Sequence, residues 1–337
     1  MRVVTGIYPV LAIAVACGFA SDTQKTPKRP TPPSLGIKTP GIRIPFADLK
    51  SELEFEAPAP PGWIGLADSI LIPTPDGLSR IDPKTKESKF GEPIGGLKQP
   101  CAGVVNAFTS LWVANCGDGT LARLDAKTYK VTKTLETGTG AARIGIAANA
   151  DSVWMLTDKR GTLSRIDPAQ NLVVAEFRVY ADCNTLVFGE TALWLTCPAE
   201  NRVLRVDPQT NLVDKSIEVS AAPGALAVGE SSVWVLCEKE GKVDRIDPKT
   251  NKVTKTIDLG APANRGAMAF GEGSLWVSMP GFPITRIDPV GEKVVQQFYG
   301  EGGGFLVTTQ NSVWLADPTA GKLLRLDTRR IAATLAE

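Results

Sequence analysis

A pattern of about 41 residues repeats along most of the chain, and this repeat constrains the fold more than any other feature. Its most regular element, an arginine, an aliphatic residue and an aspartate, recurs with steps of 43, 42, 40, 40, 41 and 39 residues. The seven copies begin at Arg80, Arg123, Arg165, Arg205, Arg245, Arg286 and Arg325. A second element, made of a small residue, an apolar residue and a tryptophan, occurs in six of the copies. Its tryptophans are Trp112, Trp154, Trp194, Trp234, Trp276 and Trp314. A fixed period of this length indicates a repeated supersecondary unit.

Each repeat contains four short runs with the composition of strands. In the fifth copy these runs cover residues 224–228, 232–237, 242–246 and 253–259, and Gly- or Asp-Pro-containing turns separate them. Four strands repeated in this way are typical of one blade of a β-propeller, a fold with about 4–8 blades. The sequence therefore predicts an all-β fold, a seven-bladed β-propeller of four-stranded antiparallel blades.

How the ring closes is left open by the sequence. The last copy ends in residues 331–335, which can serve as its fourth strand, so that the ring closes without an N-terminal strand. Residues 53–56 can still add an outer strand to blade 7 or to blade 1.

The two repeated elements are predicted to be structural. Asp247 and the following proline suit a turn, because Asp can accept hydrogen bonds from its own downstream amides and Pro fixes φ. The tryptophans suit packing between blades. A residue type that recurs seven times at one blade position does not make a ligand site, which needs different groups around it.

The first 20 residues have the composition of an export signal. Residues 3–16 are apolar, too short and too weakly flanked for a stable membrane helix, and end in small residues. Two cleavage sites fit. Ala14-Val15-Ala16-Cys17 resembles a bacterial lipobox, which makes Cys17 a lipid anchor, whereas Gly18-Phe19-Ala20 suits ordinary signal peptidase. We expect export to the periplasm or cell envelope, and we favour the lipid-anchored form because a flexible spacer follows.

These patterns divide the chain into three segments. Residues 1–20 are the export signal, residues 21–57 a Thr/Pro/Lys-rich tether and N-terminal extension, and residues 58–337 the propeller. The spacer 21–43 has five cationic residues and one acidic residue, and residues 44–337 carry a net charge of about −4. We therefore expect no nucleic-acid partner, and membrane contact only through a lipid anchor.

Six cysteines fit an oxidising compartment. Cys101 and Cys116 bracket the first hairpin of blade 2, and Cys183 and Cys197 bracket that of blade 4. We predict these two pairs as disulfides, although four cysteines allow three pairings. Cys237 is left over, and we expect it to be a buried, inert thiol.

The blade consensus resembles that of a known family. The stretch "RIDPKTNKVTKTIDLG", preceded by "GESSVWV", is similar to the YVTN-type repeat and to the bacterial streptogramin (virginiamycin B) lyase propellers. The likeness extends over nearly the whole chain after the signal. The residues that carry it build blades, so it implies the fold and says little about activity.

The chain contains no histidine. The resemblance implies a histidine and a bound magnesium ion for lyase chemistry, and a base that titrates near neutrality has no ready substitute here. Ser-His-Asp hydrolysis, His-ligated haem and the common zinc sites are excluded for the same reason. The related gluconolactonase-like propellers bind calcium through Glu, Asn and Asp, which this chain can imitate, although it has no EF-hand-like loop. We expect no catalytic residues and no cofactor, with a divalent cation as the alternative.

The loops that lead into each innermost strand vary from blade to blade, as a ligand site requires. The positions eleven residues before each tryptophan, or before Leu71 in blade 1, are Pro60, Cys101, Arg143, Cys183, Pro223, Arg265 and Gly303. Arg143 and Arg265 are three blades apart, so they should face each other across the channel. The other candidates are Asp182, Asn184, Asn264 and Glu301 in these lead-in loops and Asp118, Asp158 and Asp317 in the loops between second and third strands.

Two hypotheses follow for these arginines. They hold an anionic or carboxylate-bearing ligand, or they pair with the nearby acids and plug the channel.

Three functional classes fit the sequence. The first is an exported, monomeric scaffold that binds a protein, peptide or glycan in the cell envelope. The second is a histidine-free enzyme of the lyase or lactonase type that uses carboxylates and a divalent metal. The third is the propeller subunit of a periplasmic redox complex.

Overall fold

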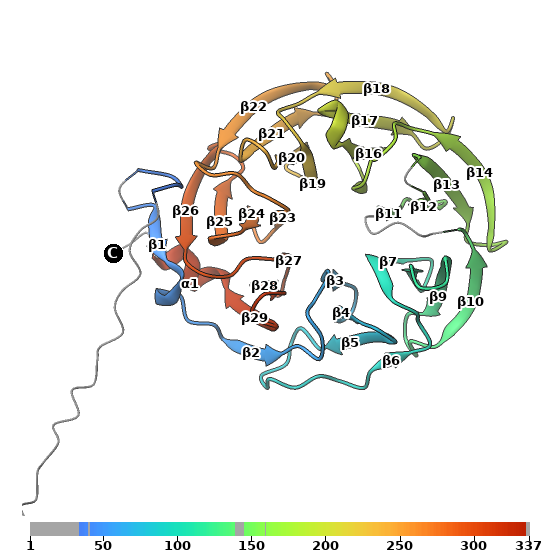
Figure 1. The fold of residues 1–337 in the computed structure, drawn as a ribbon, viewed down its shortest axis with the longest axis horizontal. Coiled ribbons are helices and arrows are strands. Elements are labelled where there is room, and N and C mark those ends of the chain that lie inside the picture. The colour runs from blue at the N-terminus through green and yellow to red at the C-terminus, as the bar shows by residue number, and fades with distance from the viewer. Residues whose placement is uncertain (1–33, 40, 139–144, 159, 335–337) are drawn as a thin grey trace, which may run out of the picture. The chain divides into compact units, whose positions relative to one another are not determined.

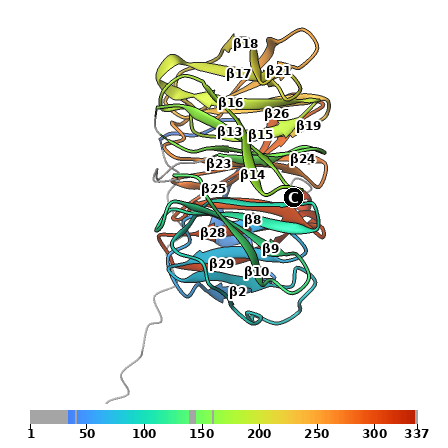
Figure 2. The ribbon, with the colours of Figure 1, turned by 90° about the vertical axis from the view of Figure 1, so that its right-hand side faces the viewer.

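The protein is an all-β ring. The computed structural model describes residues 34–39, 41–138, 145–158 and 160–334, which form seven sheets arranged as blades around a centre (Figure 1). Within each blade the chain starts beside the centre and steps outward through antiparallel neighbours (Figure 1). Figure 2 shows the same blades from the side. The predicted seven-bladed β-propeller is confirmed.

The first four blades follow the chain in order. Blade 1 contains β3 (Gly65–Leu66), β4 (Ile70–Thr74), β5 (Gly77–Ile81) and β6 (Ile94–Gly95). Blade 2 contains β7 (Pro100–Ala107), β8 (Ser110–Asn115), β9 (Thr120–Asp125) and β10 (Val131–Glu136). Blade 3 contains β11 (Ile146–Ala148), β12 (Val153–Leu156), β13 (Thr162–Asp167) and β14 (Leu172–Arg178). Blade 4 contains β15 (Leu186–Gly189), β16 (Ala192–Cys197), β17 (Arg202–Asp207) and β18 (Leu212–Glu218), with the 3-10 turn η2 (Pro198–Glu200) after β16.

The last three blades add the termini. Blade 5 contains β19 (Pro223–Gly229), β20 (Ser232–Cys237), β21 (Lys242–Asp247) and β22 (Lys252–Asp258). Blade 6 contains β23 (Ala267–Gly271), β24 (Ser274–Met279), β25 (Phe282–Asp288), β26 (Lys293–Tyr299) and the N-terminal β1 (Arg43–Pro45). Blade 7 contains β27 (Phe305–Thr309), β28 (Ser312–Asp317), β29 (Lys322–Asp327) and the N-terminal β2 (Leu53–Glu56). A 3-10 turn, η1 (Phe46–Asp48), separates β1 from β2, and helix α1 (Thr328–Ala333) follows β29.

The repeated arginine and tryptophan pack together inside the sheets. In six blades the tryptophan is fully buried and the arginine Cζ lies 4.9–5.9 Å from its ring centroid, a cation–π geometry. In blade 5, Arg245 Nε donates to Ser232 Oγ at 2.8 Å, and Nη1 pairs with Glu292 of blade 6. This arginine therefore joins two strands of its own blade to the next blade.

The repeated aspartate forms the turn that the sequence predicts. In all seven copies its Oδ1 accepts the backbone N–H two residues downstream, at 2.7–3.1 Å. In the six blades that have the tryptophan, the arginine and the tryptophan are thus engaged with each other, and in all seven the aspartate is engaged by its own turn.

The ring closes through an N-terminal strand. β2 pairs antiparallel with β29, with Phe55 opposite Leu323. Phe55 is 2% exposed and contacts the rings of Trp314 and Phe90. Of the alternatives that the sequence leaves open, residues 53–56 are the outer strand of blade 7.

The prediction of a fourth strand at 331–335 is wrong. Residues Thr328–Ala333 form helix α1, and Leu335 lies outside the described residues. Asp327 caps the helix by accepting the Arg329 N–H at 2.7 Å, and Asp is a favoured N-cap residue. The outer position beside β29 is occupied by β2, so the C-terminal segment turns away and buries Ile331.

The N-terminal extension packs on blade 6 as well. β1 pairs in parallel with β26. The fully buried Gln297 accepts the Ile37 N–H at 2.8 Å and donates to the Leu259 carbonyl at 3.0 Å. Both N-terminal strands lie within residues 21–57, the segment that the sequence predicts as tether and extension. Among the described residues, no helix is long and apolar enough to cross a membrane.

Candidate functional site

Two sets of loops meet at one end of the blades. In an antiparallel blade, the loop that leads into the first strand lies at the same end as the loop between the second and third strands. In blade 4 the lead-in loop is bonded to the second strand near this end: the Asn184 N–H donates to the Thr196 carbonyl of β16 at 3.0 Å, and Thr196 Oγ1 donates to Asn184 Oδ1 at 2.9 Å. Asn184 therefore holds its own blade together.

Arg265 is exposed and held by its backbone. Asn264 and Arg265 have φ values of 28° and 64° and are both exposed. The left-handed region is uncommon for residues other than glycine. The Arg265 N–H donates to Glu238 Oε2 at 3.0 Å, and the Ala263 N–H donates to the Glu238 carbonyl at 2.8 Å. Glu238 thus fixes the backbone, while the guanidinium of Arg265 has no hydrogen bond or ion pair with any other described residue.

The opposing arginine lies outside the described residues. Arg143 belongs to the stretch 139–144, for which the structure gives no placement. The prediction that Arg143 and Arg265 face each other across the channel stays a prediction.

Three candidate acids serve their own loops. Asp118 accepts from Thr120 Oγ1 at 2.8 Å and lies 3.7 Å from Lys98 Nζ. Asp317 is buried, and its Oδ1 accepts the backbone N–H groups of Thr319 and Ala320 at 2.9 and 3.0 Å. Neither acid is paired with Arg265.

Asp158 is the most heavily bonded of these acids. It accepts hydrogen bonds from the Thr162 N–H and hydroxyl and lies 3.3 Å from Arg160 and 3.6 Å from Arg178. Burial raises the pKa of Asp158, but the hydrogen bonds from Thr162 and the charge of Arg178 outweigh it and hold that pKa below its ordinary value. Asp158 is therefore ionised at neutral pH and neutralised by its own blade.

The remaining candidates are exposed at the lead-in loops. Asp182, with φ 61°, and Glu301 are exposed in the loops of blades 4 and 7. Within the described part of the chain neither forms an ion pair with Arg265. The hypothesis of a channel plugged by these salt bridges therefore has no support from the described residues.

Both predicted disulfides are confirmed. Cys101 is bonded to Cys116 and Cys183 to Cys197, each between a first strand or its lead-in loop and the end of the second strand. The covalent bonds therefore fasten the start of the first strand in blade 2 and the lead-in loop in blade 4.

Cys237 is a free, buried thiol in blade 5. Burial, followed by the Asp244 carboxylate 3.7 Å away, raises the pKa of this thiol well above its ordinary value. A thiol that stays protonated is a poor nucleophile, so the sequence-based prediction of an inert Cys237 agrees with its surroundings.

Glu238 is the residue that sequence reasoning missed. Glu238 follows Trp234 by four positions, just as the candidate Asp158 follows Trp154 by four positions. The spacing from the repeated tryptophan could therefore have identified Glu238. No group of three or more His, Cys, Asp or Glu side chains among the described residues has a geometry that could hold a metal ion.

No protein-family model matches the chain, and no curated protein matches it. Solved structures do match in fold. Virginiamycin B lyase from Staphylococcus aureus superposes with a TM-score of 0.68 at 16% identity, covering 81% of this chain and 98% of the lyase. The WD40 domain of Neurospora crassa Pan2 gives 0.66 at 12% identity, covering 82% of this chain and 94% of that domain.

BamB from Moraxella catarrhalis also matches, with a TM-score of 0.57 at 14% identity, covering 78% of this chain and 81% of BamB. At these identities the matches establish the propeller fold alone. The resemblance to virginiamycin B lyases therefore holds for the fold, and membership of the YVTN family stays a prediction.

Proposed function

We propose that the protein is an exported propeller of the cell envelope that acts as a binding or scaffold module. Its ligand is an anionic group carried by a protein, peptide or glycan, and it is bound on the channel face around Arg265. In this proposal Arg143 faces Arg265 across the channel, and Cys17 anchors the chain.

The observation that carries the proposal is the difference between the repeated arginines of the blades and Arg265. The seven arginines of the repeated Arg-aliphatic-Asp element, called the ladder arginines below, lie over aromatic rings within the scaffold. Arg265, in contrast, is held by its backbone only and is exposed. A planar guanidinium with unused donors suits a carboxylate. The histidine-free composition supports binding rather than the acid–base catalysis of a lyase.

Thermal shift with small anionic probes tests the channel site. Glutarate and glucuronate are titrated against the chain, its Arg143→Ala/Arg265→Ala variant, and a control with Arg330→Ala, an exposed arginine of helix α1. A ligand of the native state raises Tm, so the rise should occur for the chain and the control and vanish in the double variant. An equal rise in the folded double variant would contradict the proposal.

A further inference from the structure

The contact between blades 1 and 2 breaks the pattern of the other blades. Blade 1 has Leu71 in place of the tryptophan, and its ladder arginine, Arg80, lies instead over Tyr129 of blade 2, with Cζ 4.8 Å from the ring centroid. A cavity of about 370 Å³ opens at this contact. It is lined by Arg80, residues 92–96 and residues 128–131.

Arg80 also differs from the other ladder arginines in its hydrogen bonds. In the six other copies an Nη atom donates to a protein oxygen, and these arginines are Arg123, Arg165, Arg205, Arg245, Arg286 and Arg325. Arg80 Nε donates to the Glu92 carbonyl at 2.9 Å. Neither of its Nη atoms has a hydrogen-bond or ion-pair partner in the part of the chain that the structure describes, so both remain able to hold a carboxylate.

The outer strand of blade 1 is shorter than that of blade 5. β5 pairs with the outer strand β6 only at Gly77 and Leu78, whereas β21 of blade 5 pairs with its outer strand at six positions. Further along β5, the Gly91 N–H donates to the Arg80 carbonyl. The segment that contains Gly91 therefore covers this part of the edge, and a partner segment would contact the side chain of Arg80 in the cavity without adding a strand to the sheet.

The cavity lining has Arg80 and Lys130 against the single acid Glu92, and the segments that supply it are basic in an otherwise acidic propeller. Residues 80–93 and 125–133 contain seven Lys or Arg residues and four acidic ones, whereas residues 44–337 carry a net charge of about −4. The tether of this chain is itself basic, so its charge does not suit the cavity. Charge complementarity points to an acidic partner.

We propose that the groove between blades 1 and 2 binds an acidic, extended segment of a partner protein. In this site Arg80 receives a carboxylate, and the exposed Lys130 adds positive charge at the rim. The site is independent of the channel face.

Fluorescence anisotropy tests this proposal on the whole propeller. The probe is a labelled, amidated heptapeptide in which Val and Glu alternate. The control peptide has the same sequence with Gln in place of each Glu. We expect the Gln peptide to bind at least about tenfold more weakly, since hydrogen bonds to charged groups are the stronger ones. Arg80→Gln should weaken binding of the Glu peptide by about tenfold and Lys130→Gln by about two- to threefold.

Matched controls keep the result decisive. Lys252→Gln removes an exposed lysine of β22 and should leave the affinity unchanged. Loss of peptide binding in Arg265→Ala, with binding kept in folded Arg80→Gln, would instead place the peptide on the channel face and overturn the proposal. Because Arg80 packs on Tyr129, Tm is measured for each variant, and Lys130→Gln decides the matter if Arg80→Gln fails to fold. Equal binding of both peptides, or unchanged affinity in the folded variants, would overturn the proposal. Displacement of the peptide by free glutarate at equal carboxylate concentration would overturn the assignment to a peptide.

Discussion

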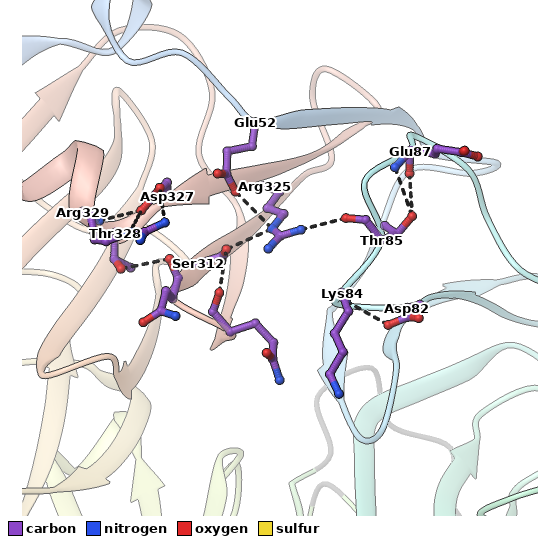
Figure 3. Close-up of polar contacts among 12 residues, drawn as sticks. Glu52, Asp82, Lys84, Thr85, Glu87, Ser312, Arg325, Asp327, Thr328 and Arg329 are labelled. Carbon is purple, nitrogen blue, oxygen red and sulfur yellow. Dashed lines mark hydrogen bonds and ion pairs between the residues drawn. The ribbon is translucent and has the colours of Figure 1, made fainter.

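Glu52 and Arg325 meet at the seam where the ring closes, with Glu52 Oε2 3.2 Å from Arg325 Nε (Figure 3). The same Nε lies 3.0 Å from Ser312 Oγ, and Nη1 donates to the Thr85 carbonyl of blade 1 at 2.9 Å. One guanidinium therefore joins the N-terminal extension, blade 7 and blade 1. The fold is complete only when segments from opposite ends of the sequence have met.

Phe55→Ala should destabilise the protein strongly, because Phe55 is the buried side chain of the closing strand. We expect a loss of about 3–5 kcal/mol in the free energy of unfolding, the usual cost of truncating a buried Phe. Urea unfolding measures it. Glu56→Ala, which truncates an exposed neighbour on the same strand, should change stability by no more than about 0.5 kcal/mol. Similar values for both variants would mean that β2 contributes little to closure.

Removing the Cys101–Cys116 disulfide should lower stability by about 2–4 kcal/mol, the typical effect of releasing such a cross-link. The bond closes a loop with a sequence separation of 15 residues. Urea unfolding of the Cys101→Ser/Cys116→Ser variant measures the loss. Cys237→Ser serves as the control without a disulfide. In the oxidised native protein a thiol reagent should not modify Cys237, and rapid modification would show that this thiol is accessible.

The blade pattern was predictable because it is local. Trp234, Arg245 and Asp247 recur at fixed spacing, and each contacts residues of its own blade or of the adjacent one. The cysteine pairs were predictable for the same reason, since each brackets one hairpin.

The closure was not predictable from any single repeat. Residues 331–335 have a strand-like composition, but the competing strand β2 lies far away in the sequence, and Asp327 supplies a helix cap instead. At the candidate site, the side chain of Glu238 fixes the backbone beneath Arg265, a tertiary contact that spans 27 residues.

Asp158→Asn should make stability less dependent on pH in acid. The folded-state pKa of Asp158 is lowered, so its contribution is present above the unfolded-state pKa of about 4 and is lost as pH falls from there through the folded-state value. Thermal unfolding between pH 2 and 7 measures the slope. Asp76→Asn, an exposed turn residue, is the control. A slope that is unchanged in Asp158→Asn would show that this carboxylate has no part in acid unfolding.

Cys17→Ser should abolish lipid attachment if the lipobox is the true processing site. Cells fed an alkyne-labelled fatty acid should yield labelled, membrane-associated protein from the unaltered chain. The variant should be unlabelled and released from the membrane fraction. Ala20→Leu, which alters the alternative cleavage site, should leave labelling intact. Unlabelled, soluble protein from the unaltered chain would instead favour ordinary signal peptidase.

A metal titration separates a scaffold from a histidine-free lyase or lactonase. An enzyme of that type needs a divalent ion at the channel face, and a site with a Kd of about 10 μM in 10 mM metal would stabilise the native state by about 4 kcal/mol. We expect Mg²⁺ and Ca²⁺ to leave Tm unchanged, because Asp118, Asp158 and Asp317 are each engaged by their own loops. The comparison is with protein treated with EDTA. A rise in Tm that EDTA reverses and Asp317→Asn removes would favour the enzyme.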